Sequence, residues 1–79
     1  MIELKKIFRN LTETEKALLK LMALGYDDKV IMAKLKVSKW FINKRIKNFR
    51  RELNITAMRD IRVEIVDNYY EYLKLVKTR

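Results

Sequence analysis

The chain has 79 residues, with 19 Lys and Arg against 10 Asp and Glu, which gives a formal net charge of +9. It contains no Cys, His or Pro and one Gly. This composition excludes a disulfide framework and thiolate or imidazole metal sites, and it disfavours sheets built from hairpins. One small domain is expected, and the positive charge indicates an anionic partner, with nucleic acid ahead of an acidic membrane surface.

The first half of the chain predicts a lead-in followed by two helices. Residues 1–10 carry enough apolar side chains for a short helical lead-in. Thr12 followed by Glu15 has the pattern of a capping box. The helix that it opens is expected to end at Gly25, the one residue free to adopt a left-handed C-cap without strain. Asp27 is then the expected N-cap of a second, short helix.

The second half predicts two longer helices. A tight turn at residues 36–37 leads to Ser38, the expected N-cap of a helix that runs to about residue 52. Thr56 is expected to cap a last helix that reaches about residue 77. The chain is therefore predicted to be all-α, with four or five helices in a single domain. Its parts are the lead-in 1–10, a helix-turn-helix core over 12–55 and a long C-terminal helix over 56–77.

The helix over residues 39–52 divides into an apolar face and a basic face. At 3.6 residues per turn, one narrow apolar stripe consists of Ile42, Ile46, Phe49 and Leu53. The roughly opposite stripe consists of Trp40, Lys44, Lys47 and Arg51, flanked by Asn43, Asn48 and Arg50. Six of the thirteen residues from Lys39 to Arg51 are Lys or Arg and none is acidic, whereas a solvated helix usually mixes Lys with Glu. This unopposed charge indicates contact with phosphates.

A short helix, a tight turn and a longer basic helix follow the order of a helix-turn-helix, whose second helix enters the major groove of double-stranded DNA. The side chains expected to contact bases are Asn43, Lys44, Lys47 and Trp40. Those expected to contact phosphates are Lys29, Lys34, Lys36, Lys39, Arg45, Arg50 and Arg51. Two alternatives stay open: Trp40 as a partial plug of the core, and the whole basic face as merely solvated surface.

From Leu11 to about Ile55 the chain resembles the LuxR/GerE-type helix-turn-helix family, at the family's spacing and without a gap. The matching positions are Leu11, Thr12, Glu15, Leu19, Gly25, Lys29, Ile31, Leu35, Val37, Ser38, Ile42, Ile46 and Leu53. The resemblance implies a four-helix domain of a transcription factor that dimerises through its last helix. It also implies base contacts from the positions of Asn43, Lys44 and Lys47.

The chain departs from the pattern of this family at four positions, which are Trp40, Phe41, Asn43 and Arg45. No operator sequence is therefore transferred from the family. At this length we expect a short, stand-alone GerE-like member rather than a regulator with an attached sensing domain. The helical layout is also similar to that of region four of a sigma factor.

The last helix spreads its apolar residues over about half of its circumference or more, which is wider than one core contact needs. A narrow acidic stripe indicates that this helix faces away from DNA, and it consists of Asp60, Glu64, Asp67 and Glu71. The apolar excess predicts a homodimer. The expected interface residues are Ile61, Ile65, Tyr69, Tyr72, Leu73 and Val76. In the alternative, the N-terminal segment of the same chain covers the excess.

Catalysis is not expected, and neither is a cofactor or a metal, because the sequence has no glycine-rich phosphate loop, metal-ligand spacing or nucleophile–base set. No apolar run approaches a membrane span and no signal-peptide core is present, so we expect a cytoplasmic protein of a bacterial or phage-infected cell. The rival functions are a protein–protein adaptor that docks on RNA polymerase or another regulator, and a phage-type DNA-packaging or recombination accessory. The unopposed charge around Asn43 and Lys47 favours a DNA-binding transcriptional regulator.

Overall fold

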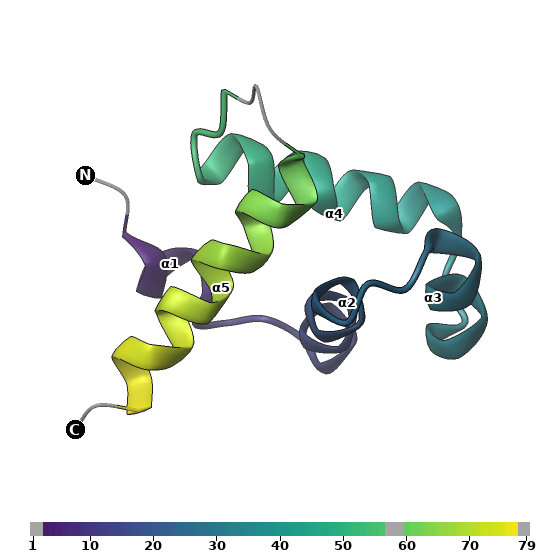
Figure 1. Ribbon diagram of the computed structural model, residues 1–79, viewed down its shortest axis with the longest axis horizontal. Coiled ribbons are helices and arrows are strands. Elements are labelled where there is room, and N and C mark those ends of the chain that lie inside the picture. Colours follow the sequence, from purple (N-terminus) through teal and green to yellow (C-terminus); the bar gives the residue numbers. More distant parts are fainter. Residues whose placement is uncertain (1–2, 57–59, 78–79) are drawn as a thin grey trace.

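The computed structural model describes residues 3–56 and 60–77, and within these ranges the chain forms five α-helices and no strand (Figure 1). The helices are α1 (Leu4–Phe8), α2 (Glu13–Ala23), α3 (Asp28–Leu35), α4 (Lys39–Glu52) and α5 (Ile61–Lys77). The predicted all-α class with a long C-terminal helix is confirmed. The lead-in supplies the additional, fifth helix.

Helix α2 begins and ends as its sequence predicts. The N–H of Thr12 donates to Glu15 Oε1 at 2.9 Å, and the N–H of Glu15 donates to Thr12 Oγ1 at 3.1 Å, which completes the capping box. Gly25 follows the helix with a φ of 87°, a left-handed conformation that side-chain-bearing residues rarely adopt. Local chemistry therefore fixes both ends of this helix.

The turn between α3 and α4 is three residues long. Asp27 caps α3, since its Oδ1 accepts a hydrogen bond from the N–H of Val30 at 3.1 Å. Ser38 caps α4 in the same way, with its Oγ accepting from the N–H of Phe41 at 3.0 Å. Lys36 reverses the chain between them with a left-handed backbone (φ 56°, ψ 47°). The predicted short helix, tight turn and long helix are thus all present.

The start of α5 differs from the prediction. Thr56 lies outside any helix, and α5 begins at Ile61. Asp60, directly before it, accepts a hydrogen bond at Oδ1 from the N–H of Arg62 at 2.9 Å. The predicted cap at Thr56 is therefore wrong. Thr and Asp both favour helix starts, so residue type by itself does not fix where this helix begins. Met58, which the prediction placed in this helix, lies outside the described residues.

Two clusters of buried apolar side chains hold the helices together. The first joins α2, α3 and α4 and consists of Leu18, Ile31 and Ile42. The second joins α1, α2, α4 and α5 and consists of Phe8, Leu19, Phe49, Leu53 and Ile65. Ile46 packs against both clusters, so the apolar stripe of α4 runs through the whole core as predicted.

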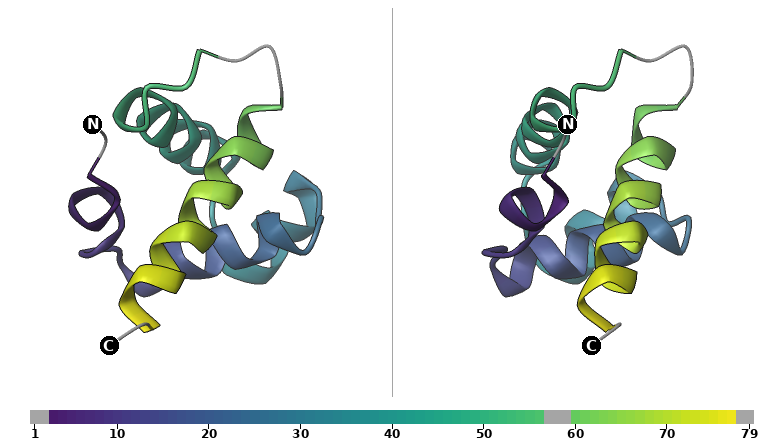
Figure 2. Two further views of the ribbon diagram at one scale, coloured as in Figure 1. Left: turned by 60° about the vertical axis from the view of Figure 1, so that its left-hand side comes forward. Right: turned by 90° about the vertical axis from the view of Figure 1, so that its left-hand side faces the viewer.

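Helix α1 lies beside α5, on the side away from α3 (Figures 1 and 2). The ring of Phe8 is buried there, with its centroid 5.6 Å from that of Phe49, 5.4 Å from that of Tyr69 and 5.6 Å from that of Tyr72. These stacked and tilted arrangements are those that aromatic rings favour. The N-terminal segment therefore covers much of the apolar excess of α5, which was the alternative to coverage by a second subunit.

Candidate nucleic-acid interface

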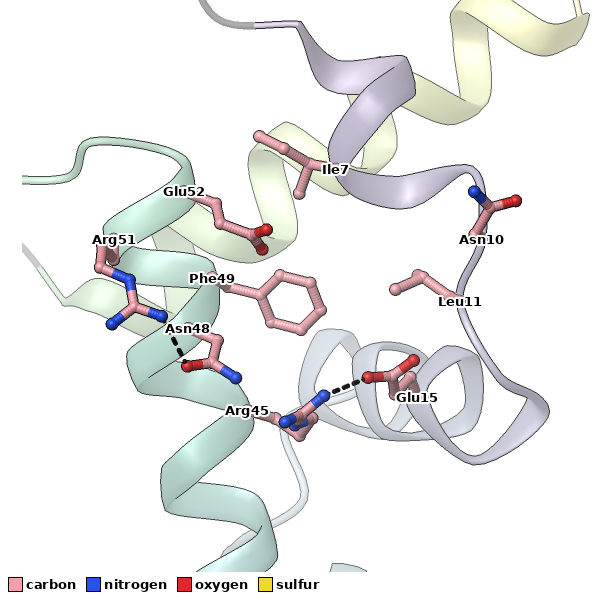
Figure 3. A pocket seen from close by; sticks show the side chains of 9 residues that line it. All are labelled: Ile7, Asn10, Leu11, Glu15, Arg45, Asn48, Phe49, Arg51 and Glu52. Atoms are coloured by element: carbon pink, nitrogen blue, oxygen red, sulfur yellow. Dashed lines mark hydrogen bonds and ion pairs between the residues drawn. The ribbon is translucent and has the colours of Figure 1, made fainter.

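The inward flank of α4 is tied to α2 by an ion pair between Arg45 and Glu15, drawn as a dashed line in Figure 3. The Arg45 guanidinium donates to Glu15 Oε2 at 2.6 Å, and the two side chains are only 27% and 13% exposed. Burial raises the pKa of Glu15, but hydrogen bonds from the Thr12 backbone and from Arg45 outweigh it and bring the pKa below its ordinary value of 4.5. One carboxylate thus caps α2 and positions α4.

Helix α3 is tied to α5 by a bidentate ion pair between Asp28 and Arg62. The two guanidinium nitrogens lie 2.5 and 3.0 Å from Oδ1 and Oδ2 of Asp28. The hydrogen bonds from Arg62 lower the pKa of Asp28 against the opposing effect of burial, and the nearby charge of Lys39 adds to this lowering. The pair orients α3, the helix before the turn at residues 36–38, on the rest of the domain.

The outward face of α4 exposes the predicted base-contacting residues. Trp40 is 68% exposed, so its alternative role as a core plug is wrong. The Nζ of Lys44 lies 4.9 Å from the centroid of the Trp40 ring. Both side chains line a shallow depression along the helix, whose other lining residues are Asn43, Lys47, Asn48 and Arg51. The structure therefore gathers all four predicted base-contacting residues on one face.

Most of the predicted phosphate-contacting residues lie at the surface. The exposed ones are Lys29, Lys34, Lys36, Lys39, Arg50 and Arg51. Some of them interact within the chain: the Nζ of Lys34 lies 5.5 Å from the Tyr26 ring centroid, and Arg51 donates to Asn48 at 3.3 Å. Such exposed contacts are weak and leave the cations accessible to an anionic ligand.

One phosphate prediction needs correction. Arg45 is committed to Glu15 and faces α2, so its charge is neutralised inside the domain rather than offered to DNA. Lys29 is exposed, so its predicted phosphate contact stays a prediction. Beside it, the Asp27 cap of α3 takes up the N–H of Val30.

A pocket of about 250 Å³ lies behind the C-terminal half of α4 (Figure 3). Its lining residues are Ile7, Asn10, Leu11, Glu15, Arg45, Asn48, Phe49, Arg51 and Glu52. Polar side chains at its wall interact with one another, as the Arg45–Glu15 and Arg51–Asn48 contacts show. Within the described part of the chain the Nε of Arg45 is buried without a hydrogen-bond partner.

The predicted dimer residues on α5 are distributed between the core and the surface. Ile65 is fully buried in the chain's own core, so it has no surface to offer to a partner. Ile61, Tyr69 and Tyr72 are partly buried against the same cluster, and Leu73 is half-buried. Val76 is exposed. The other large apolar side chains that α5 exposes are Val63, Tyr70 and Leu75.

Sequence reasoning missed the two ion pairs that position α3 and α4. Arg45 lies 30 residues from Glu15, and Arg62 lies 34 residues from Asp28. Only the capping role of Glu15 had a local signal, and nothing in the spacing of Asp28 identifies its partner. Across residues 3–56 and 60–77, no cluster of acidic side chains is arranged to hold a metal ion, and no helix has the length and hydropathy needed to cross a membrane.

Comparison with protein-family models, with curated proteins and with solved structures returned no match to this chain.

Proposed function

We propose that this chain binds double-stranded DNA as a helix-turn-helix protein, with α4 in the major groove. The observation that carries the proposal is the difference between the two faces of α4. The inward-facing cation Arg45 is neutralised by Glu15, whereas the outward cations lie on a surface to which α4 contributes no acidic residue before Glu52. Phosphates would supply the missing countercharge, and the release of their counterions would drive binding.

The proposal assigns the exposed side chains to two roles. Asn43, Lys44 and Lys47 lie on the outward face of α4, where an amide can pair with adenine and an ammonium can donate to the acceptors of guanine or thymine. Lys34, Lys36 and Lys39 lie in or beside the turn that leads into α4 and would hold the backbone phosphates. The residues that contact bases would provide sequence specificity, and the lysines that contact phosphates would fix the position of the protein on the duplex.

We further propose that the protein is a transcriptional regulator that acts as a homodimer on two-fold related half-sites. With Ile65 in the core, the surface that remains for a second copy is the exposed apolar part of α5, which includes Val63, Tyr70 and Val76. A dimer formed there would buttress two copies of α4 about one helical turn apart on DNA.

The second candidate function is an adaptor that docks on RNA polymerase or another regulator. It is favoured by apolar side chains exposed away from α4, of which Leu24 at 62% is the most accessible. Tyr26 and Val63 line a shared depression between the end of α2 and the start of α5. Exposed apolar surface of this kind marks protein–protein contacts.

The experiment that tests the proposal is selection of binding sites from random duplex DNA at physiological salt. We expect an enriched motif whose affinity falls linearly, on logarithmic axes, with salt concentration. A two-fold motif with half-sites about one helical turn apart would support the dimer, and a single half-site would contradict it. Lys44→Ala with Lys47→Ala is the matched control, since both side chains are exposed and their loss leaves the core unchanged. No enrichment with the native chain would contradict the proposal and favour the adaptor.

A further inference from the structure

Trp40 and Lys44 contact each other on the outward face of α4, and the DNA-binding proposal assigns no role to this contact. Trp40 is in the first turn of α4, directly after Lys39, and lies on the outward face of that helix. Its ring is 68% exposed, and Lys44, one turn later, places its ammonium over the ring at 4.9 Å from the centroid. A large apolar surface and a hydrogen-bond donor are thereby held side by side at the leading end of α4.

The position of this pair matters because, in a helix-turn-helix, the N-terminal residues of the second helix contact base edges in the major groove. Among the bases, thymine presents a 5-methyl group and the acceptor O4 next to each other on that edge. An apolar ring matches the methyl group, and an ammonium matches the acceptor. Cytosine offers an N4 amino donor at the place of O4, which an ammonium does not match.

The Lys44 contact is weak, as exposed cation–π contacts are, but it favours one use of the ring over another. A side chain inserted between base pairs needs both of its faces free, but one face of the Trp40 ring is covered by the Lys44 ammonium. Insertion would have to break this cation–π contact, whereas a one-sided contact in the groove preserves it. The geometry therefore favours a contact made by the edge of the ring, because a methyl group on the uncovered face would lie on the far side of the ring from the Lys44 ammonium.

From these observations we propose that Trp40 and Lys44 together recognise thymine, with the edge of the indole ring packed on the 5-methyl group and the Lys44 ammonium donating to O4. This inference rests on the proposed function, because it requires α4 to enter the major groove. Thymine is then the base preferred at the N-terminal end of α4, and Trp40 is the residue that determines this specificity.

The test compares two duplexes that differ only in the methyl group: alternating dA–dT and alternating dA–dU, each about two helical turns long. Affinity is measured for both at the same salt concentration. The native chain should bind the dA–dT duplex more tightly by about four-fold for each methyl group that the ring buries, the ratio expected for one methylene-sized apolar group. Trp40→Ala should bind both duplexes equally, while Trp40→Phe should retain most of the preference.

Two further measurements keep the test decisive. Because Trp40 is the only tryptophan of the chain, its fluorescence and its quenching by acrylamide report on this contact directly, and the ring should become protected in the dA–dT complex. Lys44→Ala should weaken binding to both duplexes but keep the methyl preference. The exposure of both side chains predicts unchanged circular dichroism for every variant.

The outcomes separate the inference from the function on which it rests. Equal binding of the native chain to both duplexes would overturn thymine recognition and leave DNA binding intact. A methyl preference that survives in Trp40→Ala would do the same, since it would then reflect the duplex and not the ring. Lengthening of the duplex on binding would replace the groove contact with insertion. Failure to bind either duplex at low salt would overturn both proposals.

Discussion

Helices α4 and α5 are the two longest helices of the chain's described residues, and each has a surface feature that its packing in the domain does not require. Helix α4 has an excess of positive charge on its outward face, and α5 has an excess of apolar surface. The chain itself covers much of the second excess, because α1 lies on α5 and buries Phe8 against Tyr69 and Tyr72. By contrast, Arg45 is the one cation of α4 that forms an ion pair with another helix within the described residues.

This difference follows from the physical costs involved. Exposed apolar surface is costly in water, so any flexible segment with apolar residues gains free energy by covering it. Exposed charge is well solvated, so folding gains little from pairing it. An apolar excess is therefore ambiguous evidence for a partner, whereas unopposed charge concentrated on one helix face is the stronger indication of an external ligand.

Replacing Phe8 with Ala should be the most destabilising of these changes. The side chain is buried and stacks between α4 and α5, so its loss is expected to cost about 3–5 kcal/mol of unfolding free energy. Urea titration followed by circular dichroism provides the measurement. Leu24→Ala is the control, since a 62% exposed side chain should contribute less than about 0.5 kcal/mol. Equal stability of the two variants would mean that α1 does not cover α5.

Substitution of two neighbouring cations of α4, Arg45 and Lys44, should have opposite effects on stability and on DNA binding. Arg45→Ala removes the partner of a largely buried carboxylate and should cost about 1–3 kcal/mol of stability. Its DNA affinity should equal that of the native chain at temperatures where both are folded. Lys44→Ala should leave stability within about 0.5 kcal/mol of native and weaken DNA binding. If Arg45→Ala reduced the salt dependence of binding, the guanidinium would be a phosphate contact after all.

Substitution of an exposed lysine should reduce either sequence specificity or overall DNA affinity, depending on where the lysine lies in the domain. Lys47→Ala is expected to cost about 1–3 kcal/mol on a specific site and to relax the preference at one base pair. Lys34→Ala, near the end of α3, should weaken all sequences alike and reduce the salt slope by about one unit. Titrations of specific and random duplexes at several salt concentrations distinguish the two. A sequence-selective loss from Lys34→Ala would contradict its assignment to the DNA backbone.

The smallest effect is the contribution of the interhelical ion pairs to acid sensitivity. The pKa values of Glu15 and Asp28 lie below their ordinary values of 4.5 and 3.8, so the unfolded chain binds more protons than the folded chain in this range. Their contribution to stability is complete above the ordinary values and is lost as the pH falls through the lowered ones. Denaturant titrations at a series of acidic pH values should show this loss. Asp28→Asn should make stability depend less on pH in this range. An unchanged pH dependence in this variant would mean that the Arg62 contact does not stabilise the folded state.

Prediction from sequence succeeded where local spacing carries the information. Thr12, Asp27 and Ser38 act as caps because each needs only a backbone N–H within the next three residues. The apolar stripe of α4 was identified because 3.6 residues per turn fixes which side chains share a face. The start of α5 was misplaced because Thr56 and Asp60 have the same local preference, and spacing does not rank them.

Local patterns in the sequence are sufficient for the all-α class, the caps of three helices and the unopposed basic face on which the DNA-binding proposal rests. Packing of the helices places Ile65 in the core, lays α1 on α5 and turns Arg45 toward Glu15 instead of solvent. These outcomes depend on contacts between residues about 30 or more positions apart, such as Asp28 with Arg62. Helical periodicity specifies which residues share a face, but which face meets which neighbour is set by packing the whole chain around one core.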